Sequence, residues 1–146
     1  MRIDKASHAV GGWTMILMGL AHLAGHIHGH TAEHSAEEQK VLDAMEGLPL
    51  GAPGSTTLAD IFSGFSLTFT VLSLLIGALA LILLRPPSDR PGILRPVRIL
   101  LVGFLGIETI LSAIWFLPPP TVFLAVATAA FFVSLLTTGR SEAPGP

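Results

Sequence analysis

The chain has 146 residues, of which 51% are hydrophobic and only 12% are charged, and its mean hydropathy is +0.69. Soluble domains carry about a quarter charged residues, and disorder needs low hydrophobicity and high charge, so both classes are excluded. The net charge of −2 gives no basic footprint for nucleic acid. Without cysteine there is no disulfide, c-type haem attachment, iron–sulfur ligation or thiol nucleophile. These totals indicate a small integral membrane protein.

Apolar stretches predict an all-α membrane bundle of four transmembrane helices. A spanning helix needs roughly 20 mostly apolar residues, and such stretches cover residues 9–28, 58–84, 97–117 and 121–138. Pro118, Pro119 and Pro120 separate the last two stretches, because consecutive prolines end a helix. Thr121 stands where a cap would start the fourth helix. We expect residues 1–140 to form a single domain and residues 141–146 to be a disordered tail.

The basic residues predict the orientation. Of the eight lysines and arginines, all but Lys40 fall on one side of a four-span chain. Those on that side are Arg2, Lys5, Arg85, Arg90, Arg95, Arg98 and Arg140. Positive charge marks the cytoplasmic side, so we expect a bacterial inner-membrane protein with both termini in the cytoplasm and residues 29–57 outside. A signal peptide is the competing interpretation of the N-terminus, but no A-x-A cleavage site follows its apolar core.

The segment between the first two spans predicts a short helix. Ser35 and Glu38 have the spacing of a capping box. Val41, Met45 and Leu48 then recur at helical spacing with charged residues off that face. We expect an amphipathic helix lying on the outer membrane surface.

Ionisable residues inside a membrane span are candidates for function. His22, His26 and Glu108 qualify, and Asp60 lies at the start of the second span. Their depths place all of them between the midplane and the outer face, so we expect one polar pocket that opens outward. Two histidines and a carboxylate suit a transition metal such as Zn, Cu or Fe, and a single histidine can ligate haem. The alternative for Glu108 is a protonated side chain that holds the bundle together through hydrogen bonds.

A second histidine cluster follows, because His28, His30 and His34 come directly after His26. Such a composition attracts metal ions. If the first helix continues past Gly29, then His26, His30 and His34 stack on one face. If the helix ends there, the segment is a metal-sequestering loop, a solvated polar loop or a pH-sensing segment.

Two further expectations concern the first span, one on helix contacts and one on His8. Ala21 and Gly25, and Gly25 and Gly29, have a small-xxx-small spacing that allows another helix to approach closely. His8 is interpreted as a residue at the cytoplasmic boundary of the membrane.

Two short segments carry a resemblance. The second span begins Leu58-Ala-Asp-Ile-Phe-Ser-Gly-Phe-Ser-Leu67, and the first contains Gly19-Leu-Ala-His22. Both resemble one uncharacterised group of small bacterial inner-membrane proteins, which are broadly like the DoxX-type families. The resemblance implies a four-helix bundle and carries no catalytic residue.

The sequence leaves three classes of function open. The first is a module that binds a transition metal or haem at His22, His26 and Glu108, with a membrane enzyme as one form of it. The second is an accessory subunit of a larger membrane complex. The third is a proton-coupled carrier that relays protons through Glu108 and His22 and needs to form a homo-oligomer. In each class we expect the lipid bilayer to surround the protein, and we do not expect nucleic acid as a partner.

Overall fold

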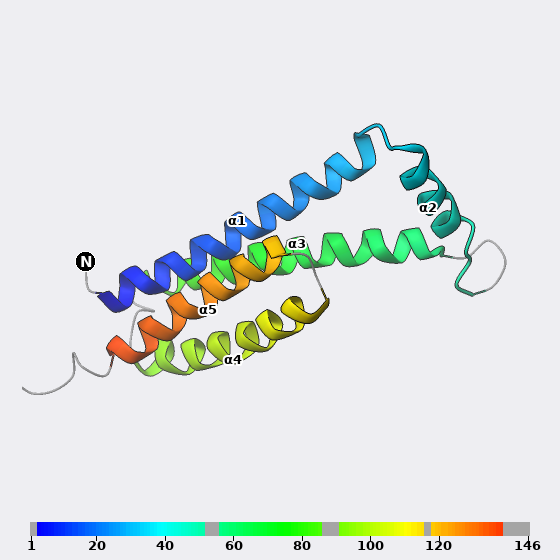
Figure 1. The fold of residues 1–146 in the computed structure, drawn as a ribbon. Helices are drawn as coiled ribbons and strands as arrows, with labels where there is room; N and C mark the ends of the chain where they lie inside the picture. The colour runs from blue at the N-terminus through cyan, green and yellow to red at the C-terminus, as the bar shows by residue number, and fades with distance from the viewer. Residues whose placement is uncertain (1–2, 52–55, 86–90, 116–117, 139–146) are drawn as a thin grey trace, which may run out of the picture. The chain divides into compact units, whose positions relative to one another are not determined.

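A computed structural model of the chain describes residues 3–51, 56–85, 91–115 and 118–138. Its helices are α1 (Ile3–Thr31), α2 (Ala36–Glu46), α3 (Leu58–Ile82), α4 (Pro91–Trp115) and α5 (Pro118–Thr138), as Figure 1 shows. All of these except α2 are long and apolar enough to cross a membrane. The prediction of an all-α chain with four candidate spans is therefore confirmed. The orientation stays a prediction, and the predicted disordered tail, residues 141–146, lies outside the described residues.

The helices are grouped in two compact units. The first contains residues 1–18 and 73–146, and the second contains residues 19–72. Both boundaries between the units fall inside helices, one within α1 and one within α3. The predicted single domain stays a prediction.

The core of the first unit includes buried apolar side chains from each of its long helices. Within it, α4 and α5 pack against each other along their lengths (Figure 1). The buried apolar side chains come from all of the long helices: Met15, Met18, Ala80, Leu94, Leu105, Leu124, Ala127 and Phe131. Most other large apolar side chains of these helices are exposed, as expected of a protein whose outer surface meets lipid.

The consecutive prolines take a different role from the one predicted. Pro118, Pro119 and Pro120 form the first turn of α5 instead of a break before Thr121. The first backbone N–H groups of a helix have no partner inside it, so proline loses nothing there and its fixed φ favours the helix. In the same way α4 begins at Pro91, earlier than the predicted Val97. Pro96 lies beyond the first turn, where proline removes one hydrogen bond of the helix.

The close approach between α1 and α3 occurs at different glycines from those predicted. A Cβ atom on Gly77 would lie 2.6 Å from the carbonyl oxygen of Gly12 and 2.9 Å from the backbone nitrogen of Ile16. Nothing described lies within 4 Å of a Cβ atom built on Gly25 or Gly29. The small-xxx-small spacing at Gly25 and Gly29 is thus not used for packing within the described part of the chain.

The second unit contains α2, which begins at the capping box that the sequence indicates. The backbone N–H of Glu38 donates to Ser35 Oγ at 3.2 Å, and the backbone N–H of Ser35 donates to Glu38 Oε2 at 2.8 Å. The helix ends at Glu46 and is capped by Gly47, whose N–H donates to the Asp43 carbonyl oxygen at 2.8 Å. That α2 lies on the outer membrane surface stays a prediction.

The capping box lowers the pKa of Glu38 below its ordinary value. The backbone N–H of Ser35 has the largest effect, followed by the Ser35 hydroxyl. A lowered carboxyl pKa means that the ionised form stabilises α2. This stabilisation is present above the ordinary pKa and is lost as the pH falls through the lowered pKa.

An NMR titration of the Glu38 side chain in the full chain measures this pKa. Ser35→Ala keeps the backbone N–H and should raise the Glu38 pKa part of the way to its ordinary value. Ser35→Pro should raise it further, because proline lacks the N–H and the φ of −62° at Ser35 suits a proline ring. A Glu38 pKa that is unchanged in both variants would contradict the capping interaction.

Candidate functional site

Helix α1 continues past Gly29 to Thr31 and presents three histidines on one side. His22, His26 and His30 stand one turn apart, and we call them the histidine face. The rings of His26 and His30 contact each other edge to face, with centroids 4.5 Å apart. The first helix therefore continues past Gly29 and does not end there as a loop. His26 and His30 form a contacting pair on it.

Two hydroxyl groups of α3 lie against the histidine face. Ser66 Oγ lies 3.1 Å from His22 Nε2, and Ser63 Oγ lies 3.5 Å from His30 Nε2. The His22 ring also meets the ring of Phe69 edge to face at 4.9 Å. His22 is therefore held in a fixed orientation by α3, whereas the ring of His26 is held through its contact with His30.

The other predicted histidines are outside this face. His28 is exposed on another side of α1. His34 comes after the helix ends at Thr31, so the expected stack of His26, His30 and His34 does not form as a continuous helical row. The end of α1 explains this: the Thr31 hydroxyl donates to the Ile27 carbonyl oxygen at 3.0 Å, and the next residues are not helical.

The two predicted carboxylates have separate surroundings. Asp60 and Thr57 together cap the start of α3. The Asp60 Oδ2 accepts hydrogen bonds at 2.8 Å from both the backbone N–H and the hydroxyl of Thr57. The backbone N–H of Asp60 donates to Thr57 Oγ1 at 3.2 Å. Glu108 is half-buried on α4 and belongs to the first unit, whereas His22 and His26 belong to the second. The one pocket expected from these four residues is therefore not found within either unit.

The described residues hold no group of three or more His, Cys, Asp or Glu side chains arranged for a metal ion. What the second unit does hold is the His26–His30 pair, with hydroxyl groups beside the flanking rings. Two neutral imidazoles one helical turn apart can both ligate one transition-metal ion. A hydroxyl that hydrogen-bonds to a histidine fixes which ring nitrogen is free.

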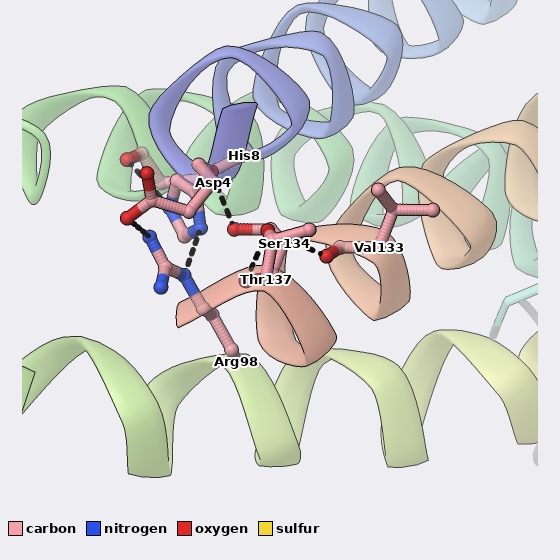
Figure 2. A network of polar contacts seen from close by, with 7 residues as sticks. Asp4, His8, Arg98, Val133, Ser134 and Thr137 are labelled. Carbon is pink, nitrogen blue, oxygen red and sulfur yellow. Dashed lines mark hydrogen bonds and ion pairs between the residues drawn. The ribbon is translucent and has the colours of Figure 1, made fainter. Parts of the chain in front are cut away.

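A buried polar network in the first unit was not predicted. Figure 2 shows Asp4 and His8 of α1 and Ser134 of α5 gathered around Arg98 of α4. Arg98, His8 and Ser134 are 0% exposed and Asp4 is 6% exposed. Arg98 is thus a buried residue inside α4 and not a cation that flanks a loop, and His8 is not a residue at the surface of the unit.

The hydrogen bonds of this network determine the tautomer of His8. Arg98 Nε donates to His8 Nδ1 at 3.3 Å, and a guanidinium can only donate. His8 Nδ1 is therefore the acceptor, and Nε2 carries the hydrogen that is donated to the Ala80 carbonyl oxygen at 3.1 Å. Arg98 Nη2 lies 4.0 Å from Asp4 Oδ2, and Ser134 Oγ donates to the Asp4 carbonyl oxygen at 2.6 Å. Segments of α1, α3, α4 and α5 are tied together by these contacts.

Two signals in the sequence point to this network. Asp4 and His8 have i, i+4 spacing, so they share a helix face. Arg98 follows Val97 and precedes a run of apolar residues, where a charge is costly unless it has a partner. Because these side chains are buried, the network joins the helices of the first unit. At the histidine face, by contrast, His22 and His26 are half-buried and His30 is exposed.

A comparison with known protein families, curated proteins and solved structures finds no match for the chain. The resemblance to DoxX-type families stays a prediction.

Proposed function

We propose that the chain is a bacterial inner-membrane protein that binds a transition-metal ion, zinc, copper or iron, through His26 and His30 at the C-terminal end of α1. The observation that carries the proposal is the contact between these two rings, whose centroids lie 4.5 Å apart on one helix face. Imidazole nitrogen suits each of these metals.

The length of α1 supports access to the pair. A helix of 29 residues is about 43 Å long, whereas the hydrocarbon core of a bilayer is roughly 30 Å thick. With both termini in the cytoplasm, as the lysines and arginines favour, the excess length carries His26 and His30 toward the outer interface. An ion from the outer compartment could then reach them without crossing the hydrocarbon.

His22 and Ser66 have a supporting role in this proposal. The Ser66 hydroxyl and the Phe69 ring hold His22 against α3, which leaves the next two turns of α1 for the ligands. The proposal takes its ligands from the second unit, and Glu108 belongs to the first.

Metal binding by the untagged protein in mild detergent tests the proposal. The affinity is measured by isothermal titration with Zn²⁺ and with Cu²⁺, and elemental analysis after dialysis checks the bound metal. The affinity should fall at least ~10-fold in His26→Ala and in His30→Ala. Loss of a residue that only orients a ligand already lowers metal affinity to this extent, and loss of the ligand itself should cost no less. His28→Ala is the matched control, since it removes an exposed histidine from the same helix but not from the histidine face.

Two results would count against the proposal. If the wild-type protein binds neither Zn²⁺ nor Cu²⁺, and elemental analysis finds no iron in it, the pair is not a metal site, and an accessory role in a larger membrane complex becomes the better hypothesis. If His28→Ala weakens binding as much as His30→Ala does, the ion is bound by histidines in general and not by this pair.

A further inference from the structure

The buried network brings three helix ends of the first unit to one level. His8 of α1 donates to the Ala80 carbonyl oxygen of α3 at 3.1 Å and accepts from Arg98 of α4 at 3.3 Å. The N-termini of α1 and α4 and the C-terminus of α3 are therefore neighbours. A further basic residue stands three to five positions from each of these contacts, on the side of the helix end: Lys5, Arg85 and Arg95.

This end of the first unit has an excess of positive charge. Among the described residues near these three helix ends, Asp4 is the only carboxylate. Asp4 and Arg98 are both buried and lie 4.0 Å apart, so Arg98 offsets the charge of Asp4 inside the unit. Arg95, by contrast, is exposed. Its charge is therefore directed to the surroundings of the unit.

Arg95 stands at one end of an otherwise apolar face of α4, which we call the Arg95 face. Ile99, Gly103, Ile110 and Ile114 follow Arg95 at helical spacing. The three isoleucines are 52%, 63% and 64% exposed, and nothing described lies within 4 Å of a Cβ atom built on Gly103. The Arg95 face thus presents one cation followed by open apolar surface.

A phospholipid has the complementary arrangement, with a phosphate at one end and acyl chains behind it. The helix rises about 12 Å from Arg95 to Gly103, which is within the ~15 Å that one leaflet contributes to the hydrocarbon core. An arginine can bind a phosphate through two parallel hydrogen bonds. A soluble phosphate would gain nothing from the isoleucines, and an apolar helix would gain nothing from Arg95.

We propose that the Arg95 face binds an anionic phospholipid, whose phosphate contacts the Arg95 guanidinium while an acyl chain lies along Ile99 and Gly103. The positive charges of Lys5 and Arg85 at the same helix ends add to the attraction. In a zwitterionic lipid the cationic headgroup stands beside the phosphate, so the same charges repel it. The site belongs to the first unit and does not depend on the proposed metal site in the second.

Fluorescence quenching by brominated lipids tests this site in the full chain. The reporter protein carries Ile99→Trp, with Trp13→Phe and Trp115→Phe to remove both native tryptophans. It is reconstituted into phosphatidylcholine vesicles that contain either brominated phosphatidylglycerol or brominated phosphatidylcholine. We expect the brominated phosphatidylglycerol to bind beside the reporter about 5-fold more strongly, which is the factor that one basic residue near the membrane surface contributes.

Three variants of the reporter protein separate the site from the overall charge. Arg95→Gln should lose most of the preference for phosphatidylglycerol, and Arg95→Lys should keep most of it because the charge remains. Lys40→Gln is the charge-matched control, since it removes an exposed cation of the second unit. This control should leave the preference unchanged.

A second measurement needs no reporter. Mass spectrometry counts the phosphatidylglycerol and phosphatidylcholine that the wild-type chain and Arg95→Gln retain in mild detergent. We expect the wild type to retain phosphatidylglycerol in preference and Arg95→Gln to lose that preference.

Several results would overturn the proposal. Equal binding of the two lipids would do so, as would a preference that Arg95→Gln leaves intact or that Lys40→Gln lowers to the same extent. If glycerol phosphate in excess, at matched ionic strength, removes the preference, then a soluble phosphate without acyl chains is sufficient and the lipid is not the ligand.

Discussion

Replacing Arg98 with methionine is expected to lower the free energy of unfolding by about 3–5 kcal/mol, the usual cost of breaking a buried ion pair by removing one partner. The guanidinium is fully buried, lies 4.0 Å from the Asp4 carboxylate and donates to His8. Without it, the carboxylate stays in the interior without this cation, and His8 Nδ1 loses its donor. The midpoint of unfolding by SDS in mixed micelles measures the effect.

The control for this prediction is on the same helix. Arg95→Met removes an exposed arginine three residues earlier, so it should change the free energy of unfolding by no more than ~0.5 kcal/mol. The double variant Asp4→Asn/Arg98→Met should recover part of the loss, since it removes both charges. If Arg98→Met is as stable as Arg95→Met, the buried network does not hold the helices together.

Replacing Gly77 with alanine is expected to destabilise the protein by about 1–3 kcal/mol, in the range found for overpacked cores. The added Cβ would lie 2.6 Å from the Gly12 carbonyl oxygen and 2.9 Å from the Ile16 nitrogen. Both are backbone atoms, so the strain cannot be relieved by turning a side chain, and α1 and α3 must move apart. The same SDS unfolding experiment measures the loss.

Gly25→Ala is the matched control, because Gly25 is also a helical glycine but has nothing described within 4 Å of its Cβ position. It should leave stability unchanged or raise it by up to ~1 kcal/mol, because alanine favours the helix more than glycine does. Equal effects of Gly77→Ala and Gly25→Ala would argue against a close crossing at Gly12 and Gly77.

Local features of the sequence predicted the local features of the fold. The start of α3 at Leu58 and the end of α5 at Thr138 agree with the predicted spans, since hydrophobicity and length are properties of a stretch by itself. The capping box at Ser35 and Glu38 is present because its hydrogen bonds join residues three apart. Such features require no knowledge of which helices are neighbours.

The sites were harder to predict because they depend on those neighbours. Asp60 was expected to line a shared polar pocket, but its carboxylate accepts hydrogen bonds from Thr57 at the start of α3. His8 and Arg98 are 90 positions apart, and only the packing of α1 against α4 makes them partners. Gly25 and Gly29 were predicted to allow close helix approach, yet the close contact among the described residues occurs at Gly12 and Gly77.

The sequence by itself thus determined that the chain is helical, that four of its helices are long enough to cross a membrane, and that His22 and His26 share a helix face. Each of these follows from composition, length or a helical repeat. Only the tertiary structure decided that Arg98 is buried, which glycines allow α1 and α3 to approach, and that Ser63 and Ser66 lie beside the histidine face. These depend on how each helix is rotated against its neighbours, and a helix with apolar residues on most sides carries little information about that rotation.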